Sequence, residues 1–142
     1  MRVSDVHVRR VFVDTSALAA IALVRDGDHA SARSILSVLG ASRRQLLTTN
    51  LIAAETHALV LARADRRLAR RVLAQIDGAF EIARVTEADE IAGRAILDRY
   101  ADKDFSLTDA ISFAVMDRLR LRAAFAFDRH FAQYGLDVLT VE

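Results

Sequence analysis

The sequence contains no cysteine and no proline, and each absence narrows what the protein can do. Without cysteine there can be no disulfide, no thiolate zinc site and no cysteine nucleophile. The lack of cysteine also fits a reducing compartment. The N-terminus carries charges where a signal peptide has an apolar core, so we expect a cytoplasmic protein. Without proline, breaks between elements must be identified from Gly, Asn, Asp and Ser.

Long apolar runs and lysine are also scarce. Charged residues interrupt every apolar stretch well before the roughly 18 residues of a membrane-spanning helix, so no membrane segment is expected. Lys103 is the only lysine, and arginine is the better bidentate partner for phosphate, although a codon bias would give the same composition. With 142 residues and 53% hydrophobic residues, the chain fits a single domain, residues 1–142. Residues 1–10 are a short polar lead-in to which we assign no role.

Short apolar runs alternate with helical segments along the chain. Strands are expected over residues 11–13, 45–48, 80–85, 123–127 and 137–141. Helices are expected over residues 15–24, 28–39, 51–63 and 65–77, then from Thr86 to about 100, from Ser106 to about 121, and over 129–134, with Asn50 as the N-cap of the third. Helical crossovers between short strands predict an α/β fold. We expect a three-layer sandwich with a central parallel sheet of about five short strands and helices on both faces.

Four acidic residues lie where this topology would bring several elements together. Asp14 and Asp128 each follow a strand, Asp109 lies in the first turn of a helix, and Glu55 lies within another helix. Ligands of parallel sheets bind at the carboxyl ends of the strands. Carboxylates gathered there need a positive partner, and a set without Cys or His suits Mg²⁺ or Mn²⁺ rather than zinc. Such ions support phosphodiester hydrolysis with few protein groups.

Each acid also has a structural interpretation. Asp14 and Asp128 could be helix N-caps, and Asp109 could be the partner of Ser106 in a capping box. Glu55 is harder to explain, because at 100° per residue it falls within one apolar stripe of its helix. That stripe consists of Leu51, Ala54, Ala58, Leu59 and Ala62. A charge within it needs a partner, which could be an arginine or a metal ion.

Three histidines show no ligand spacing and are expected at the surface. They are His7, His29 and His130. His130 remains a weak candidate for the site, because it follows Asp128 closely.

Four segments resemble the motifs of PIN domains, in the same order and with matching spacing. They are Phe-Val-Asp-Thr-Ser-Ala-Leu (residues 12–18), Asn-Leu-Ile-Ala-Ala-Glu (50–55), Phe-Ser-Leu-Thr-Asp-Ala (105–110) and Phe-Ala-Phe-Asp-Arg-His-Phe (125–131). The resemblance covers nearly the whole chain, and a stand-alone PIN domain of this size is similar to VapC-type toxins of prokaryotic toxin–antitoxin pairs. It implies a PIN-like fold, a Mg²⁺- or Mn²⁺-dependent endoribonuclease, inhibition by a small antitoxin and commonly a homodimer.

The same resemblance assigns roles to particular residues. It implies that the metal-binding, catalytic acids are Asp14, Glu55, Asp109 and Asp128. Ser16 and Ser106 match small polar positions that often support such acids, and Asp104 is a possible additional acid.

RNA contacts should come from outside this acidic site. A dense arginine group comprises Arg63, Arg66, Arg67, Arg70 and Arg71, and it could hold RNA phosphates. It could instead be a solvated helix face paired with Asp65 and Asp77, or a contact with a partner or a second subunit.

Other functions remain open from the sequence. One is a non-catalytic RNA-binding or adaptor PIN domain. A phosphatase of the haloacid-dehalogenase type would need a second Asp where this chain has Ser16, and a receiver domain would need a Lys after its phosphorylated Asp, whereas Lys103 precedes Asp109. The absence of a Walker A motif argues against a nucleoside triphosphatase.

Overall fold

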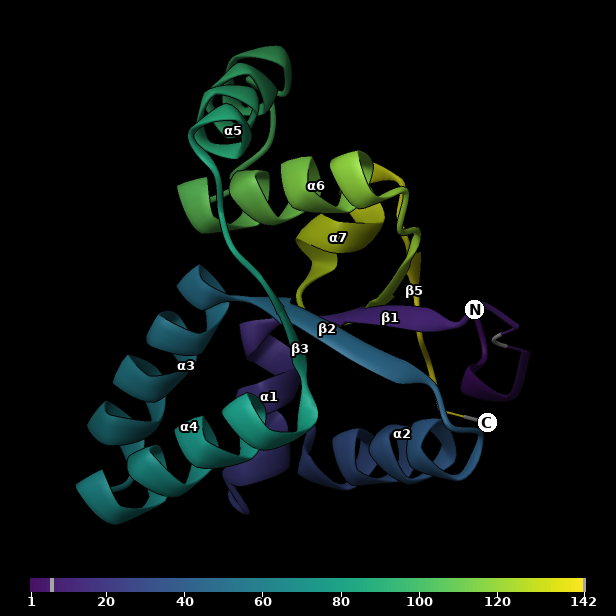
Figure 1. Ribbon diagram of the computed structural model, residues 1–142, viewed down its shortest axis with the longest axis vertical. Helices are drawn as coiled ribbons and strands as arrows, with labels where there is room; N and C mark the ends of the chain where they lie inside the picture. Colours follow the sequence, from purple (N-terminus) through teal and green to yellow (C-terminus); the bar gives the residue numbers. More distant parts are fainter. Residues whose placement is uncertain (6, 142) are drawn as a thin grey trace.

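A five-stranded parallel sheet organises the protein in a computed structural model, which describes residues 1–5 and 7–141 (Figure 1). The strands are β1 (Arg10–Val13), β2 (Gln45–Thr49), β3 (Glu81–Ala83), β4 (Ala123–Phe125) and β5 (Asp137–Val138). They lie side by side in the order β3-β2-β1-β4-β5, and each neighbouring pair is parallel. The expected three-layer α/β sandwich is therefore confirmed.

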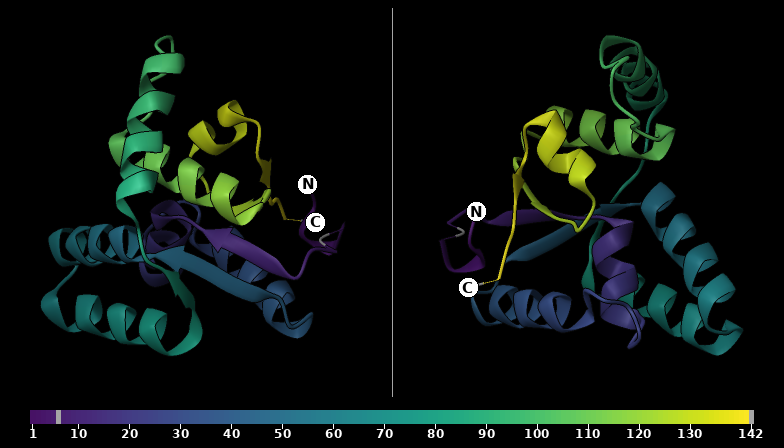
Figure 2. Two further views of the ribbon diagram at one scale, coloured as in Figure 1. Left: turned by 45° about the horizontal axis from the view of Figure 1, so that its top comes forward. Right: turned by 180° about the vertical axis from the view of Figure 1, so that it is seen from behind.

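Helices cover both faces of the sheet. They are α1 (Thr15–Ala22), α2 (His29–Ala41), α3 (Asn50–Arg63), α4 (Arg66–Ala79), α5 (Glu87–Arg99), α6 (Leu107–Leu119) and α7 (Arg129–Tyr134), preceded by the short 3₁₀ helix η1 (Val3–Asp5). Figure 1 shows α1–α4 below the sheet and α5–α7 above it, and Figure 2 shows the same layering from two other directions. Because parallel crossovers are right-handed, the change of face reflects the reversal of strand order between β1 and β4. Ligands bind at such reversals, beyond the carboxyl ends of the strands.

The central strand and a set of aromatic rings make the core around this reversal. Val11, Phe12 and Val13 of β1 are fully buried, because helices cover the strand on both sides. The Phe12 ring lies 6.1 Å from that of Phe131 in α7, which lies 5.0 Å from that of Phe113 in α6. Such ring pairs add about 0.5–1.5 kcal/mol each beyond their buried area. These contacts hold α6 and α7 against the sheet.

An ion pair and a glycine fix α5 against α6. Asp89 is almost fully buried, and its two carboxylate oxygens accept hydrogen bonds from Nε and Nη2 of Arg118, at 2.8 and 2.9 Å. The Arg118 hydrogen bonds lower the pKa of Asp89. A Cβ atom at Gly93 would lie 2.8 Å from the side chain of Ile111, so only glycine allows α5 to approach this closely.

Several expected boundaries were wrong, and the N-cap of α3 was assigned to the wrong residue. Thr49 caps α3, because its hydroxyl accepts from the Ile52 amide, whereas the Asn50 side chain accepts from the Val85 amide at 2.9 Å. β3 is shorter than the expected 80–85, and β5 ends at Val138. β4 ends at Phe125 rather than Phe127, because the Phe127 amide turns away from the sheet to donate to Ser16 Oγ.

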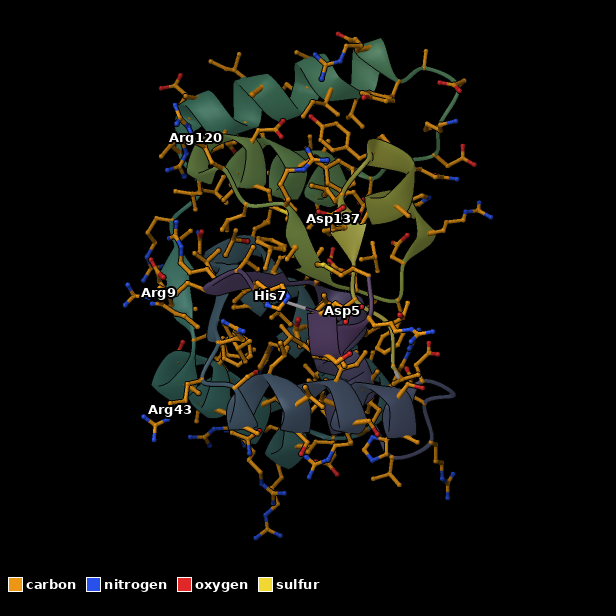
Figure 3. All side chains as sticks on the ribbon, turned by 90° about the vertical axis from the view of Figure 1, so that its right-hand side faces the viewer. Asp5, His7, Arg9, Arg43, Arg120 and Asp137 are labelled. Carbon is orange, nitrogen blue, oxygen red and sulfur yellow. The ribbon has the colours of Figure 1, made fainter. Side chains whose placement is uncertain are left out.

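Residues 1–3 of the lead-in have a structural role, whereas no role was expected for them from the sequence. Val3 is buried in the core, and its amide donates to the Thr140 carbonyl at 2.9 Å. The Thr140 amide in turn donates to the Met1 carbonyl at 2.8 Å. This segment therefore covers the edge of the sheet beyond β5, which would otherwise offer unpaired backbone groups. Figure 3 views the molecule from this side and labels Asp5 in the lead-in and Asp137 in β5.

None of the helices in the described part of the chain is long and apolar enough to cross a membrane.

Candidate active site

All four predicted acids line one cleft of about 480 Å³. Asp14 follows β1 and Asp128 follows β4, the two strands at which the strand order reverses. Asp109 approaches from the first turn of α6, and Glu55 from α3. The topology thus brings together residues that are far apart in the chain.

Asp14 is held by Ser16. Only 5% of Asp14 is exposed, and its Oδ2 accepts hydrogen bonds from Ser16 Oγ at 2.6 Å and from the Ser16 amide at 3.1 Å. Burial raises the pKa of Asp14 from 3.8 to about 6, against the lowering effect of these hydrogen bonds, and the nearby carboxylate of Asp109 raises it further. Ser16 Oγ also accepts from the Phe127 amide at 2.9 Å, so one hydroxyl joins the ends of β1 and β4.

Asp109 is both a capping residue and a member of the site. Its Oδ2 accepts from the Ser106 amide at 3.0 Å, while the Ser106 hydroxyl accepts from the Asp109 amide at 3.0 Å, which completes a capping box. Asp128 similarly caps α7, its Oδ1 accepting from the His130 amide at 2.8 Å. The predicted capping roles of Asp109 and Asp128 are therefore confirmed, but capping does not prevent the two carboxylates from binding a metal ion. In the described residues, these hydrogen bonds engage Oδ2 of Asp109 and Oδ1 of Asp128 and leave the second oxygen of each carboxylate for a ligand.

His130 belongs to the site, and its assignment to the surface was wrong. Its ring is half-buried, with Nδ1 2.9 Å from Asp109 Oδ2 and 3.1 Å from Asp128 Oδ1. The edge of the ring also packs against Phe105, at 5.5 Å between centroids. With its proton on Nδ1, His130 donates toward both carboxylates. The only sequence signal was its place two residues after Asp128, on the first turn of a helix that Asp128 caps.

Glu55 reaches the cleft from a different side of α3 than the sequence predicted. The buried side of α3 consists of Ile52, Ala53, Thr56 and Val60. The stripe assumed from the sequence is partly or fully exposed, and Glu55 itself is exposed. Glu55 therefore needs no buried partner, and its interest lies in lining the same cleft as the other three acids.

The acids offer a suitable set of atoms for a divalent cation. One ligand atom from each of Asp109, Asp128 and His130 lies within 4.8 Å of the other two. Asp14 and Glu55 line the same cleft outside this tight group. Carboxylate oxygens are the ligands that Mg²⁺ and Mn²⁺ prefer, so the acids suit these ions and His130 would hold the acids in place rather than bind the ion. A buried carboxyl with a raised pKa, such as Asp14, is stabilised in its charged form by a nearby cation.

Sequence comparison decides the family. Residues 11–136 match the PIN domain family. The chain belongs to the PIN-domain family. This PIN domain is 32% identical over 127 residues to the 23S rRNA-specific endonuclease VapC20 of Mycobacterium tuberculosis, an alignment that covers 88% of this chain and 94% of VapC20. Membership of this family leaves no place for the dehalogenase-type phosphatase or the receiver domain.

Solved structures of PIN-domain toxins share the fold. The crystal structure of M. tuberculosis VapC20, described as a sarcin–ricin loop cleaving toxin, superposes with a TM-score of 0.80 and covers 89% of this chain and 95% of VapC20. A toxin–antitoxin complex from Klebsiella pneumoniae gives 0.64 at 18% identity, covering 92% of this chain and 96% of that one. VapBC2 from Rickettsia felis, bound to a DNA fragment from its promoter, gives 0.69 at 12% identity with the same two coverages. The last two support the fold alone.

Other residues of the PIN domain that the sequence singled out lie away from the acids. Asp104 is exposed in the loop before α6 and is not among the residues lining the cleft. His7 is exposed as expected, whereas His29 is half-buried and its Nδ1 lies 2.7 Å from the Ala20 carbonyl, so that assignment was wrong. The arginines of α4 are exposed, and three of them line a separate hollow of about 410 Å³. Those three are Arg66, Arg67 and Arg70.

Proposed function

We propose that this PIN domain is a metal-dependent endoribonuclease and the toxin of a VapBC-type toxin–antitoxin pair. The observation that carries the proposal is the convergence of Asp14, Glu55, Asp109 and Asp128 on one cleft. The similarity to VapC20, an endonuclease that acts on RNA, supports the reaction class.

In this proposal, Asp109 and Asp128 would hold Mg²⁺ or Mn²⁺ with their free oxygens, together with Asp14 and Glu55, which line the same cleft. The bound ion supplies Lewis-acid chemistry, namely a lower pKa for a water and stabilisation of charge that develops on the phosphate. The protein contributes fixed negative groups that need no rearrangement during the reaction.

Supporting residues keep those groups in place. Ser16 holds one oxygen of Asp14, Ser106 holds one oxygen of Asp109, and His130 lies against both Asp109 and Asp128. In each case one carboxylate oxygen is engaged by the protein, which fixes the direction of the other. Residues in this position around metal ligands typically contribute about 10- to 100-fold to affinity or activity.

The substrate and partners follow from the same proposal. Sequence-specific recognition of RNA acts mostly on single-stranded loops, and VapC20 is described as specific for 23S rRNA, so 23S rRNA is the first substrate to test. A small cognate antitoxin would be the inhibitor, as the Klebsiella neighbour is a toxin–antitoxin complex. We further propose a homodimer that acts in the cytoplasm.

Cleavage should depend on an added divalent ion. Purified protein should cut pooled cellular RNA in Mg²⁺ or Mn²⁺ and stop cutting when EDTA is added in excess, because four carboxylates gathered without a cation repel one another. Gel analysis of RNA fragments, with an Asp109→Asn preparation as the contamination control, measures this. Undiminished cleavage in EDTA by wild type alone would exclude the metal mechanism. RNA that is bound but uncut with every ion would instead favour the adaptor function.

The exposed arginines of α4 should contribute to RNA binding. Changing Arg66, Arg67, Arg70 and Arg71 together to Gln should weaken binding and reduce the slope of log K against log salt by about 0.7 for each phosphate that is no longer neutralised. Metal-induced stabilisation should be unchanged, because the patch lies outside the acidic cleft. An unchanged salt slope, measured by titration of labelled RNA, would mean that the patch is a solvated face or a protein contact.

A further inference from the structure

One wall of the acidic cleft is a single face of α3. Glu55, Leu59 and Arg63 follow one another at intervals of four residues, and all three line the cleft. Residues four apart lie on the same side of a helix, so these side chains form a row. Eight residues of helix span about 12 Å. The row therefore runs from the acids to the outer rim of the cleft.

Charge changes sign along this row. The cleft is lined by Asp14, Asp26, Asp28, Glu55, Asp109 and Asp128, and Arg63 is the only lysine or arginine among its lining residues in the described part of the chain. Arg63 is exposed, and it takes part in none of the ion pairs found among the described residues. Asp26 lines a second hollow of about 250 Å³ together with Arg63, yet the two form no ion pair in the described part of the chain.

An RNA strand in this cleft would face a physical problem that Arg63 solves. The acids and their cation would hold one phosphate, but the neighbouring phosphates of the strand would be repelled by the remaining carboxylates. A guanidinium at the rim offers paired N–H donors that match phosphate oxygens. Leu59 lies between the two points, half-buried, and provides an apolar surface over which the sugar and base can pass.

We infer that Arg63 forms a phosphate-binding subsite, which grips the RNA strand a few nucleotides from the bond that is cut. The inference rests on the proposed ribonuclease function and adds the direction of the strand along α3. Arg63 ends α3 and Arg66 begins α4, so the subsite also connects the cleft to the arginines of α4. In this role Arg63 positions the substrate and takes no part in bond breaking.

Arg63 also has a purely structural explanation that the test must separate. It lies in the last turn of α3, where a cation stabilises the helix dipole by about 0.3–1 kcal/mol. Loss of that effect would lower the melting temperature of the protein slightly. A loss of activity with this cause would be the same whichever phosphate of the RNA is neutralised.

The experiment uses wild type, Arg63→Gln, Arg63→Lys and the control Arg94→Gln, which removes an exposed arginine from α5, on the other face of the sheet. The probe is a synthetic oligoribonucleotide that spans a junction cut by wild type in pooled ribosomal RNA. A series of these oligonucleotides carries one neutral methylphosphonate each, at successive positions.

We expect Arg63→Gln to raise KM by roughly 10-fold, as for removal of one hydrogen bond to a charged group, with kcat within about two-fold of wild type. Neutralising one phosphate away from the cut should raise the KM of wild type by a similar factor. The same neutral phosphate should not raise the KM of Arg63→Gln any further. Arg63→Lys should recover part of the loss, and Arg94→Gln should match wild type at every position.

The remaining outcomes are equally distinct. The inference is wrong if Arg63→Gln has the KM of wild type. It is also wrong if every methylphosphonate raises the KM of Arg63→Gln as much as that of wild type. In both cases the ribonuclease function stands. If wild type cuts no RNA with either ion, the proposed function and the inference both fail. The methylphosphonate comparison is made between substrates within one variant, so a change in the stability of that variant does not affect it.

Discussion

Asp109→Asn should abolish RNA cleavage, and Asp128→Asn, Asp14→Asn and Glu55→Gln should each come close to doing so. Each change removes one of the carboxylates that surround the proposed cation, so the loss should exceed the roughly 10- to 100-fold expected for supporting residues such as Ser16 and His130. Initial rates of cleavage with saturating Mg²⁺ measure the effect. Asp98→Asn, an exposed acid of α5, is the matched control and should retain full activity.

The double variant Asp109→Asn/Asp128→Asn is the sharper part of this prediction. Groups that act as one unit give losses that are far from additive, so the double variant should be little worse than the poorer single variant. Losses that multiply would mean that the two acids have independent roles, in spite of their contact with the same histidine. Asp104→Asn belongs in the same series, and near-wild-type activity would remove Asp104 from the candidate acids.

Asp14→Asn should make the metal-free protein more stable at neutral pH. The pKa of Asp14 is raised from 3.8 to about 6, so the charged carboxylate is disfavoured in the folded state, at a cost on the order of 3 kcal/mol at pH 7. Asparagine removes that cost, caps a helix nearly as well as aspartate, and can still accept the hydrogen bonds of Ser16. Urea unfolding of the two proteins in EDTA measures the difference in free energy.

The pH dependence gives the sign of the effect. Well below the ordinary pKa of 3.8, Asp14 is neutral in both the folded and the unfolded state, so the two proteins should be equally stable. As the pH rises from about 4 to above 6, wild type should lose stability relative to the variant, because the unfolded chain releases the Asp14 proton first. Added Mg²⁺ or Mn²⁺ should reverse the order by stabilising wild type more. If Asp14 is only a helix cap, the variant should keep its advantage in EDTA but should gain as much stability from the ions as wild type.

The fold, and the convergence of the four acids on one cleft, could be predicted from the sequence because both depend on local patterns. β1 is a buried apolar run followed directly by Asp14, and Ser106 and Asp109 have the spacing of a capping box. The topology then brings the ends of β1 and β4 together, since neighbouring parallel strands end at the same edge.

The errors lie where a helix or a side chain depends on its surroundings. The apolar stripe chosen for α3 contained alanines, which are compatible with either side, and the buried side proved to include Thr56 instead. The N-cap of α3 could not be assigned from type alone, because Thr49 and Asn50 are adjacent and both cap well. His130 was only a weak candidate from the sequence, because its partners include Asp109, 21 residues earlier, and such a contact has no local signal.

The pairing of β1 with β4 also determines when the site comes into existence. Asp14 and Glu55 lie before the connection from β3 to α5, whereas Asp109 and Asp128 lie after it. During synthesis, Asp14 and Glu55 therefore leave the ribosome first, and Asp109 and Asp128 follow only after β3 and α5. The protein acquires the complete set only when β4, the fourth of five strands, has been made and docked. An enzyme that attacks RNA would thus lack its complete set of acids, and be harmless to the ribosome and the message that produce it, until β4 has been made and docked.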